Sequence, residues 1–289
     1  MAAINAVHNS NLTVKATHTV GGGCINQAWK LEAEDSSQDI RKSYFVKLNA
    51  KNLQHMFEAE NAALYEIAET NTVRVPKPVT LGVSGNECWL AMEFLEMSGA
   101  GSAKQLGQQL AAMHRTSNKY YGWHRDNTIG STHQPNTQST SWVDFWREQR
   151  LGYQLETALN RGYGKLQSLG EQVMSNLETL FDGYLPQASL LHGDLWGGNW
   201  SGLADGTPVI YDPATYYGDR ETDIAMTELF GGFPKAFYEA YTEEWPLDEG
   251  YGRRKILYNL YHILNHLNLF GSSYAGQAES MMQQILHDL

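Results

Sequence analysis

One stretch in the second half of the chain, residues 190–226, constrains the fold more than any other part of the sequence. It contains the motif HGDLWGGN, in which Asp194 and Asn199 follow an apolar run that predicts a short buried strand. A second carboxylate, Asp212, ends another apolar run and lies thirteen residues after Asn199. We therefore expect two neighbouring strand ends to present three oxygen-bearing side chains to a common point.

This set of side chains suits transfer of a phosphoryl group to an alcohol. The reaction needs an anion that accepts the hydroxyl proton and oxygen ligands for the Mg²⁺ that bridges the phosphates. Asp194 is the candidate base, and Asn199 with Asp212 form the candidate metal clamp. A D-x-x-x-x-N spacing followed by a metal-binding Asp also occurs in the catalytic loop of protein kinases. Such a motif alone more often forms turns and caps, but here His192 and Gly193 precede it and Asp212 follows it.

A run of three glycines lies between two segments, residues 12–20 and 25–31, that are predicted to be strands. Backbone amides of Gly21, Gly22 and Gly23 can approach phosphate oxygens because no Cβ stands in the way. The run predicts a phosphate-binding loop, and an ordinary glycine-rich hairpin is the alternative.

Lys47 ends a predicted strand, residues 43–48, and Glu60 lies within the apolar face of a predicted helix, residues 52–69. A carboxylate in an apolar stripe is unfavourable unless it is paired, so we expect Glu60 to meet Lys47. In kinases such a pair orients the lysine toward the phosphates. The alternative for Lys47 is a side chain that extends to water.

Composition excludes several classes of protein. The chain has 289 residues with 42% hydrophobic and 18% charged residues, which are values of a globular protein. A formal charge of -11 argues against a nucleic-acid or anionic membrane partner. Without a long apolar run or a leader segment, the chain is predicted to be cytoplasmic. Cys24 and Cys88 are too few for a disulfide scaffold, and Cys24, beside the glycines, is a candidate redox-sensitive thiol.

The segments HGDLWGGN, YDPATYYGDRETDIAM and FGGFP resemble the fructosamine kinase (ketosamine kinase) family, a branch of the aminoglycoside and choline kinase group. The resemblance extends from FVK and MEFL to the C-terminal NHLNLFG, so it covers nearly the whole chain. It implies an α+β, bilobal protein-kinase-like fold. Residues 1–95 would form a small ATP-binding lobe with an antiparallel sheet and one helix, and residues 96–289 a larger, mainly helical lobe for catalysis and acceptor binding.

The resemblance also implies a reaction and roles for individual residues. Mg-ATP would lie between the lobes and give its γ-phosphoryl group to the 3-hydroxyl of a ketoamine sugar, fructosamine or ribulosamine. The product then falls apart and releases the amine, which amounts to deglycation. The Glu93 carbonyl and the Leu95 amide would contact adenine. His192 and Asp223 would support the loop that carries the general base, Asp194. Asp223 shares a helical face with apolar residues, so we expect it to be buried and paired.

Residues that contact the acceptor are suggested by a polar strip on a predicted helix, residues 253–270. Asn259, His262 and His266 in this strip are either satisfied within the core or line an acceptor pocket with Trp196, whose ring could lie against a sugar. Because no A-P-E segment follows the second Asp, the acceptor is predicted to be a small molecule rather than a docked polypeptide segment. The resemblance implies that it is a ketoamine, either a small molecule or protein-bound, and we expect the chain to be a monomer or homodimer. A kinase of aminoglycosides or choline and a catalytically silent nucleotide-binding scaffold are the alternatives.

Overall fold

The computed structural model describes residues 1–21, 25–35 and 38–289, which are all but five residues of the chain. The chain divides into two compact units. The N-terminal unit contains residues 1–102 and 201–211, and the C-terminal unit contains residues 103–200 and 212–289. The short segment that precedes Asp212 therefore belongs with the N-terminal unit. The predicted lobe boundary after residue 95 stays a prediction.

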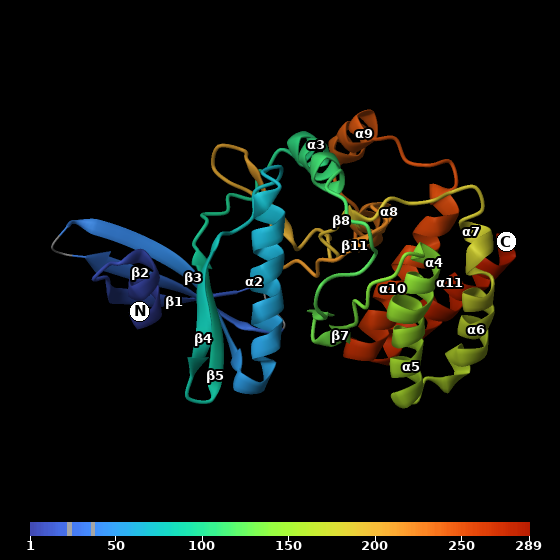
Figure 1. Ribbon diagram of the computed structural model, residues 1–289, viewed down its shortest axis with the longest axis horizontal. Coiled ribbons are helices and arrows are strands. Elements are labelled where there is room, and N and C mark those ends of the chain that lie inside the picture. Colours follow the sequence, from blue (N-terminus) through green and yellow to red (C-terminus); the bar gives the residue numbers. More distant parts are fainter. Residues whose placement is uncertain (22–24, 36–37) are drawn as a thin grey trace. The chain divides into compact units, whose positions relative to one another are not determined.

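A five-stranded antiparallel sheet in the order β1-β2-β3-β5-β4 forms the body of the N-terminal unit (Figure 1). The antiparallel sheet predicted from the sequence is confirmed. It forms because apolar and polar residues alternate along strands that short turns connect. The strands are β1 Thr13–Val20, β2 Gln27–Asp35, β3 Ile40–Ala50, β4 Pro78–Ser84 and β5 Glu87–Glu93.

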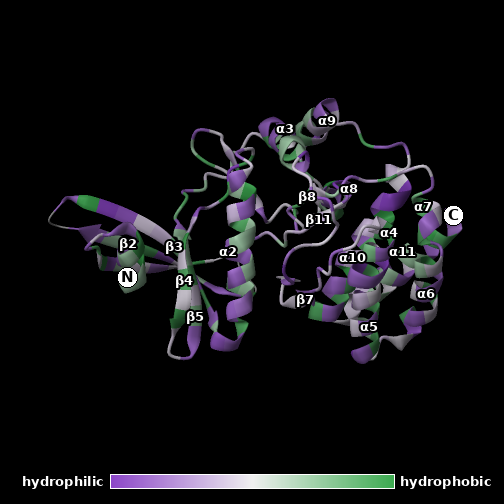
Figure 2. Ribbon diagram, viewed as in Figure 1, coloured by the Kyte–Doolittle hydropathy of each residue, from purple (hydrophilic) through white to green (hydrophobic). Residues whose placement is uncertain are grey.

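Helices pack on both faces of this sheet. Helix α2 (Gln54–Glu69), which carries both hydrophobic and hydrophilic residues along its length (Figure 2), contacts the face that carries Lys47. Helix α1 (Ala2–His8) places Ile4 in a cluster with Tyr44, which points to the opposite face because successive side chains of a strand alternate. The expectation of a single helix beside the sheet was wrong, since α1 is too short to show a clear helical period in the sequence.

The C-terminal unit is mainly helical, as expected. Its long central helix α10 contacts α5, α8 and α11. A π-helical segment lies between α4 and α5. No helix among the described residues is both long and apolar enough to cross a bilayer. The helices are α3 Ala103–His114, α4 Trp142–Phe145, the π-helical segment Trp146–Gly152, α5 Tyr153–Asn160, α6 Gln167–Ser175, α7 Leu177–Leu180, α8 Glu221–Leu229, α9 Lys235–Glu244, α10 Tyr251–Phe270 and α11 Ala275–His287.

Two short strands join the loop after residue 190 to the segment after Asp212. Strand β8 (Ser189–Leu190) pairs with β11 (Tyr217–Gly218). The pairing continues beyond the strands, because the Ala214 amide donates to the His192 carbonyl at 2.8 Å. The segment that leads into Asp194 and the segment that follows Asp212 therefore lie side by side within the C-terminal unit. Further short strands are β6 Asn127–Ile129, β7 Thr132–Gln134, β9 Trp200–Gly202 and β10 Pro208–Ile210. The second predicted strand, β10, pairs with β9 instead.

Candidate active site

The loop that carries Asp194 is held by a buried carboxylate from α8. Asp223 accepts hydrogen bonds from the His192 amide at 2.7 Å and from the Gly193 amide at 2.8 Å. Gly193 has a φ of 82°, and a Cβ at this position would lie 2.1 Å from the Ala214 carbonyl oxygen. Only glycine fits here, because the backbone is left-handed and the neighbouring chain is too close for a side chain. The conformation of the loop is thus determined before any ligand binds.

A histidine that the sequence did not single out fixes Asp223 in turn. The His114 ring makes hydrogen bonds to Asp223 Oδ2 at 3.1 Å and to the Tyr241 hydroxyl at 2.7 Å, and all three side chains are buried. Burial alone raises the pKa of Asp223, but the interactions with His114, the nearby His192 and the hydrogen bond from the Gly193 amide together outweigh it and lower the pKa below its usual value. The prediction that Asp223 is buried and paired is confirmed. Its partner is 109 residues away in the chain, so no local pattern indicated it.

Asp194, Asn199 and Asp212 come together at this loop. The Asn199 side-chain amide donates to the Asp194 carbonyl at 2.8 Å and to its carboxylate at 3.2 Å. The Asp194 side chain is partly exposed. Burial, followed by the charge of Asp212, raises the pKa of Asp194 to about 7. His192 Nδ1 lies 3.3 Å from the Asp194 amide and supports the loop as expected. The catalytic and metal-binding roles of these residues stay predictions.

The side-chain oxygen atoms of Asn199 and Asp212 suit a magnesium ion that is also bound by the phosphates of a nucleotide. Asp212 has a φ of 59°, a left-handed conformation that Asp tolerates better than most residues. Burial is the larger cause of the raised pKa of Asp194, and the charge of Asp212 is the next, so a cation would relieve the repulsion between the two carboxylates. Among the described residues no three His, Cys, Asp or Glu side chains form a metal site by themselves. Mg²⁺ usually takes one or two carboxylates and completes its shell with phosphates and water, so Asn199 and Asp212 fit the ion.

A polar hairpin supports the segment that follows Asp212. The side-chain amide of Asn127 donates to the Thr215 carbonyl at 2.7 Å, and that of Gln134 donates to the Ala214 carbonyl at 3.1 Å. Tyr261 donates to Gln134 at 2.6 Å, which ties the hairpin to α10. Sequence reasoning missed this support, because amide side chains are common in loops and only their buried partners reveal a role.

The three predicted acceptor residues differ in exposure. The Trp196 ring is 40% exposed and lies 6.4 Å from the Phe230 ring, which in turn lies 4.8 Å from the His266 ring. His262 is buried, and its Nδ1 has no hydrogen-bond partner within the described part of the chain. Asn259 Oδ1 is likewise unpartnered among those residues. The strip is therefore not satisfied by the core alone, and ligand hydroxyls are suitable partners for it.

The buried His262 leads to a testable pH dependence of stability. Burial, followed by the charge of His266, lowers the pKa of His262 to about 3. The unfolded chain binds this proton near pH 6.5 and the folded chain does not, so stability falls as the pH drops below about 6.5. At pH 5 we expect this group alone to lower the free energy of unfolding by about 2 kcal/mol. Urea unfolding at pH 7.5 and 5.0 measures the loss, and equal losses for His262→Gln and the unaltered chain would contradict it.

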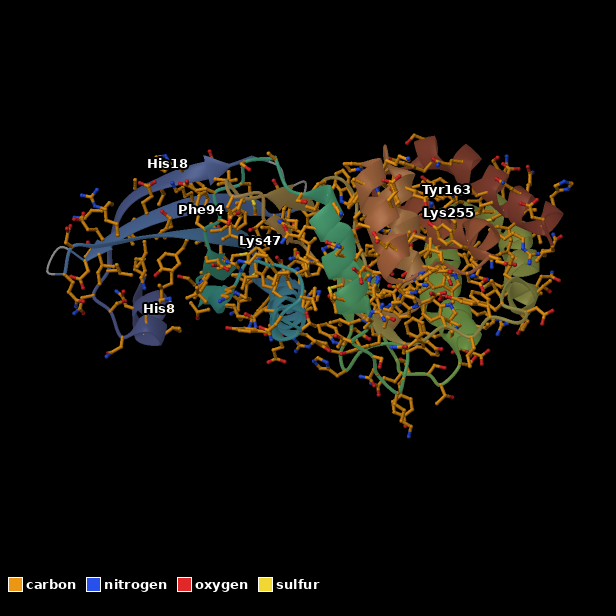
Figure 3. All side chains as sticks on the ribbon, turned by 90° about the horizontal axis from the view of Figure 1, so that it is seen from above. His8, His18, Lys47, Phe94, Tyr163 and Lys255 are labelled. Carbon is orange, nitrogen blue, oxygen red and sulfur yellow. The ribbon has the colours of Figure 1, made fainter. Side chains whose placement is uncertain are left out.

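In the N-terminal unit the predicted ion pair is present. Lys47 Nζ lies 2.6 Å from Glu60 Oε1, and the two side chains are only 8% and 12% exposed (Lys47 is labelled in Figure 3). Of the residues predicted to bind adenine, Glu93 ends β5 and pairs with Arg74 at 2.6 Å, and Leu95 follows just beyond the strand. Gly21 follows β1. The predictions for Gly22, Gly23 and Cys24 fall outside the described residues.

Removal of the charge on Glu60 tests the ion pair. We expect Glu60→Gln to raise the KM for ATP about tenfold, which corresponds to about 1.4 kcal/mol of binding, because Lys47 loses the anion that orients it. We also expect the free energy of unfolding to fall by about 2 kcal/mol, below the range for a fully buried pair because both side chains keep some exposure. The control is Glu69→Gln, an exposed residue of the same helix. An unchanged KM for Glu60→Gln would contradict the assignment.

Comparisons with known proteins agree over the whole length of the chain. The model of the fructosamine kinase family matches residues 1–288. A probable ketoamine kinase from Synechocystis sp. is 48% identical over 276 residues, which cover 94% of this chain and 91% of the relative. A chloroplastic protein-ribulosamine 3-kinase from Oryza sativa subsp. indica is 41% identical, with coverage of 96% and 80%.

Solved structures show the same similarity. The crystal structure of a putative fructosamine-3-kinase from Haemophilus somnus 129PT is 31% identical, with a TM-score of 0.87 and coverage of 99% of this chain and 96% of that one. A choline/ethanolamine kinase family protein from Mesorhizobium loti is 12% identical, with a TM-score of 0.57 and coverage of 94% and 88%. At that identity the second similarity concerns the fold alone, and it confirms the predicted kinase-like, α+β fold.

Proposed function

The chain belongs to the fructosamine kinase family, and on that premise we propose that it transfers the γ-phosphoryl group of ATP to the 3-hydroxyl of a ketoamine sugar. The observation that carries the proposal is the state of Asp194. This carboxylate is partly exposed, lies on a loop that buried hydrogen bonds hold rigidly, and has a pKa of about 7. A general base works best when its pKa is close to the operating pH.

We assign each step of the reaction to particular side chains. Asp194 accepts the proton of the sugar hydroxyl, so that the oxygen attacks the γ-phosphorus in line. Asn199 keeps Asp194 oriented through its amide, and Lys47, held by Glu60, binds the phosphates of the nucleotide. Asn199 and Asp212 would hold Mg²⁺, which neutralises phosphate charge as the phosphoryl group moves.

The acceptor is the ketoamine itself, either free or attached to a protein. Trp196, two residues after Asp194, offers an exposed ring for the apolar face of a sugar. The Nδ1 of His262, which has no hydrogen-bond partner among the described residues, is available for a hydroxyl. A protein-bound acceptor is supported by the rice relative, which is named a protein-ribulosamine 3-kinase. Loss of the phosphorylated sugar from the amine would make the reaction a deglycation, which we place in the cytoplasm.

An acceptor panel tests the function directly. ATP consumption is measured with fructosyl-lysine, ribulosyl-lysine, choline and an aminoglycoside under the same conditions. We expect turnover with at least one ketoamine at a kcat/KM well above the values for choline and the aminoglycoside, and phosphate on the 3-hydroxyl by NMR. Preferred turnover of choline or the aminoglycoside would replace the proposed acceptor. Absence of turnover with all four would leave only a nucleotide-binding scaffold.

A further inference from the structure

Five aromatic side chains form a continuous series from the catalytic loop to the surface of the C-terminal unit. We call this series the aromatic track, and its members are Trp196, Phe230, His266, Phe270 and Tyr274. His266 lies at its centre, with ring centroids 4.8 Å from Phe230, 5.4 Å from Phe270 and 5.3 Å from Tyr274. The inner end begins two residues after the proposed base, and the track therefore continues outward from the reaction site.

Both ends of the aromatic track are open to solvent. Trp196 is 40% exposed and Phe270 is 55% exposed. The partly exposed rings of Phe230 and His266 link these two exposed rings. A connected group of exposed and partly exposed aromatic rings is typical of a surface that binds a ligand, whereas single exposed rings are common. The area is therefore a candidate for ligand contact rather than a part of the core.

The backbone is built to hold these rings in place. A Cβ on Gly198 would lie 2.4 Å from the Trp196 ring, so the glycine lets the indole lie over its own loop. Gly271 has a φ of 97° and ends α10, which turns the chain so that Tyr274 contacts His266. His266 Nδ1 is 2.8 Å from the His262 carbonyl, which fixes the orientation of the central ring.

We propose that the aromatic track binds the amine portion of the ketoamine acceptor, with Trp196 beside the protonated nitrogen and the outer rings against an apolar stem attached to it. The inference rests on the proposed function and deepens it, because it names the part of the acceptor that the chain selects. A ketoamine carries its nitrogen close to the hydroxyl that is phosphorylated. The nitrogen therefore lies beside Trp196 when that hydroxyl is at Asp194.

The chemistry of the track matches this part of the acceptor. A secondary ammonium is attracted to the face of an aromatic ring, and Trp is the most effective of the side chains. Burial lowers the pKa of His266, so its ring is neutral at neutral pH and does not repel the cation. Beyond the nitrogen, methylene groups such as those of a lysine side chain would contact the exposed ring of Phe270 and the partly exposed ring of Tyr274.

Matched acceptors that differ only in the stem test the proposal. We compare fructose adducts of methylamine and butylamine, which share the sugar and the charge. Each methylene removed from water is worth about a factor of four when burial is complete, so three half-buried methylenes should raise kcat/KM about eightfold. For Phe270→Ala the ratio of kcat/KM for the butylamine adduct to that for the methylamine adduct should fall to about three. For Phe270→Ala combined with Tyr274→Ala the ratio should fall to about one. Turnover of the methylamine adduct should stay within about twofold of the original value in both variants.

The outcomes separate this proposal from the function on which it rests. The control is Leu185→Ala, which replaces an exposed apolar residue outside the aromatic track. This variant should leave kcat/KM for both adducts unchanged. Equal kcat/KM for both adducts in the unaltered chain would overturn the proposal and leave the kinase function intact. Failure to phosphorylate either adduct would overturn both. If Phe270→Ala instead converts a dimer to a monomer in sedimentation, with the eightfold preference unchanged, the track is covered by a second copy of the chain and the proposal is wrong.

Discussion

Asp194→Asn is expected to lower kcat for a ketoamine about a thousandfold, within the range that general-base catalysis contributes. The substitution keeps the shape of the side chain and an oxygen that can still accept the amide hydrogen of Asn199. It removes the charge that takes the hydroxyl proton. ATP consumption measures kcat, and calorimetry should give a Kd for ATP within about twofold of the original value.

The matched control for this variant is Asp182→Asn, an exposed aspartate of the same unit that should keep full activity. Asp194→Asn isolates the proton transfer because it leaves the loop in place, which Asp223 holds through backbone amides. A kcat within tenfold of the original would show that another group, or water, accepts the proton. The base assignment would then be wrong even if the chain is a ketoamine kinase.

Asp212→Asn should have the second largest effect, a fall in kcat/KM of about a hundredfold or more, because a charged metal ligand contributes several kcal/mol to phosphoryl transfer. The Mg²⁺ concentration that gives half-maximal rate should rise in parallel. Asn accepts a φ of 59° as readily as Asp does, so the backbone conformation is retained and the effect belongs to the lost charge.

Asp205→Asn serves as the control for the second experiment, because Asp205 is exposed and only accepts the Thr207 amide in a turn. A magnesium titration of each variant with excess ATP gives the measurement. If Asp212→Asn lowers activity but leaves the dependence on Mg²⁺ unchanged, the residue acts through the charge state of Asp194. The proposal that it binds the metal would then be wrong.

Regular elements were predictable because their signals are local. The helices predicted over residues 52–69 and 253–270 are present at residues 54–69 and 251–270, so each predicted bound lies within two residues of the observed one. The pairing of Lys47 with Glu60 was predictable as well, because a carboxylate in an apolar face requires a cation. Helix α1 was missed because its seven residues span only about two helical turns, too few to show a clear period.

The residues that hold the loop carrying Asp194 and the segment after Asp212 were not predictable in the same way. His114 resembles any histidine at the end of a helix until its ring is seen between Asp223 and Tyr241. Gln134 likewise looks like a loop residue, although it supports the chain after Asp212. In both cases the partner is more than 70 residues away, and only folding brings the atoms within hydrogen-bond distance.

The sequence alone identified the side chains to which we assign the chemistry, because Asp194, Asn199 and Asp212 stand in the order and spacing of a kinase catalytic loop. The tertiary structure alone decided how those groups behave. The pKa of Asp194, the unpartnered Nδ1 of His262 and the aromatic track all depend on burial and on neighbours from distant segments. A carboxylate has the same intrinsic chemistry anywhere in the chain, but the protein around it sets its free energy of ionisation.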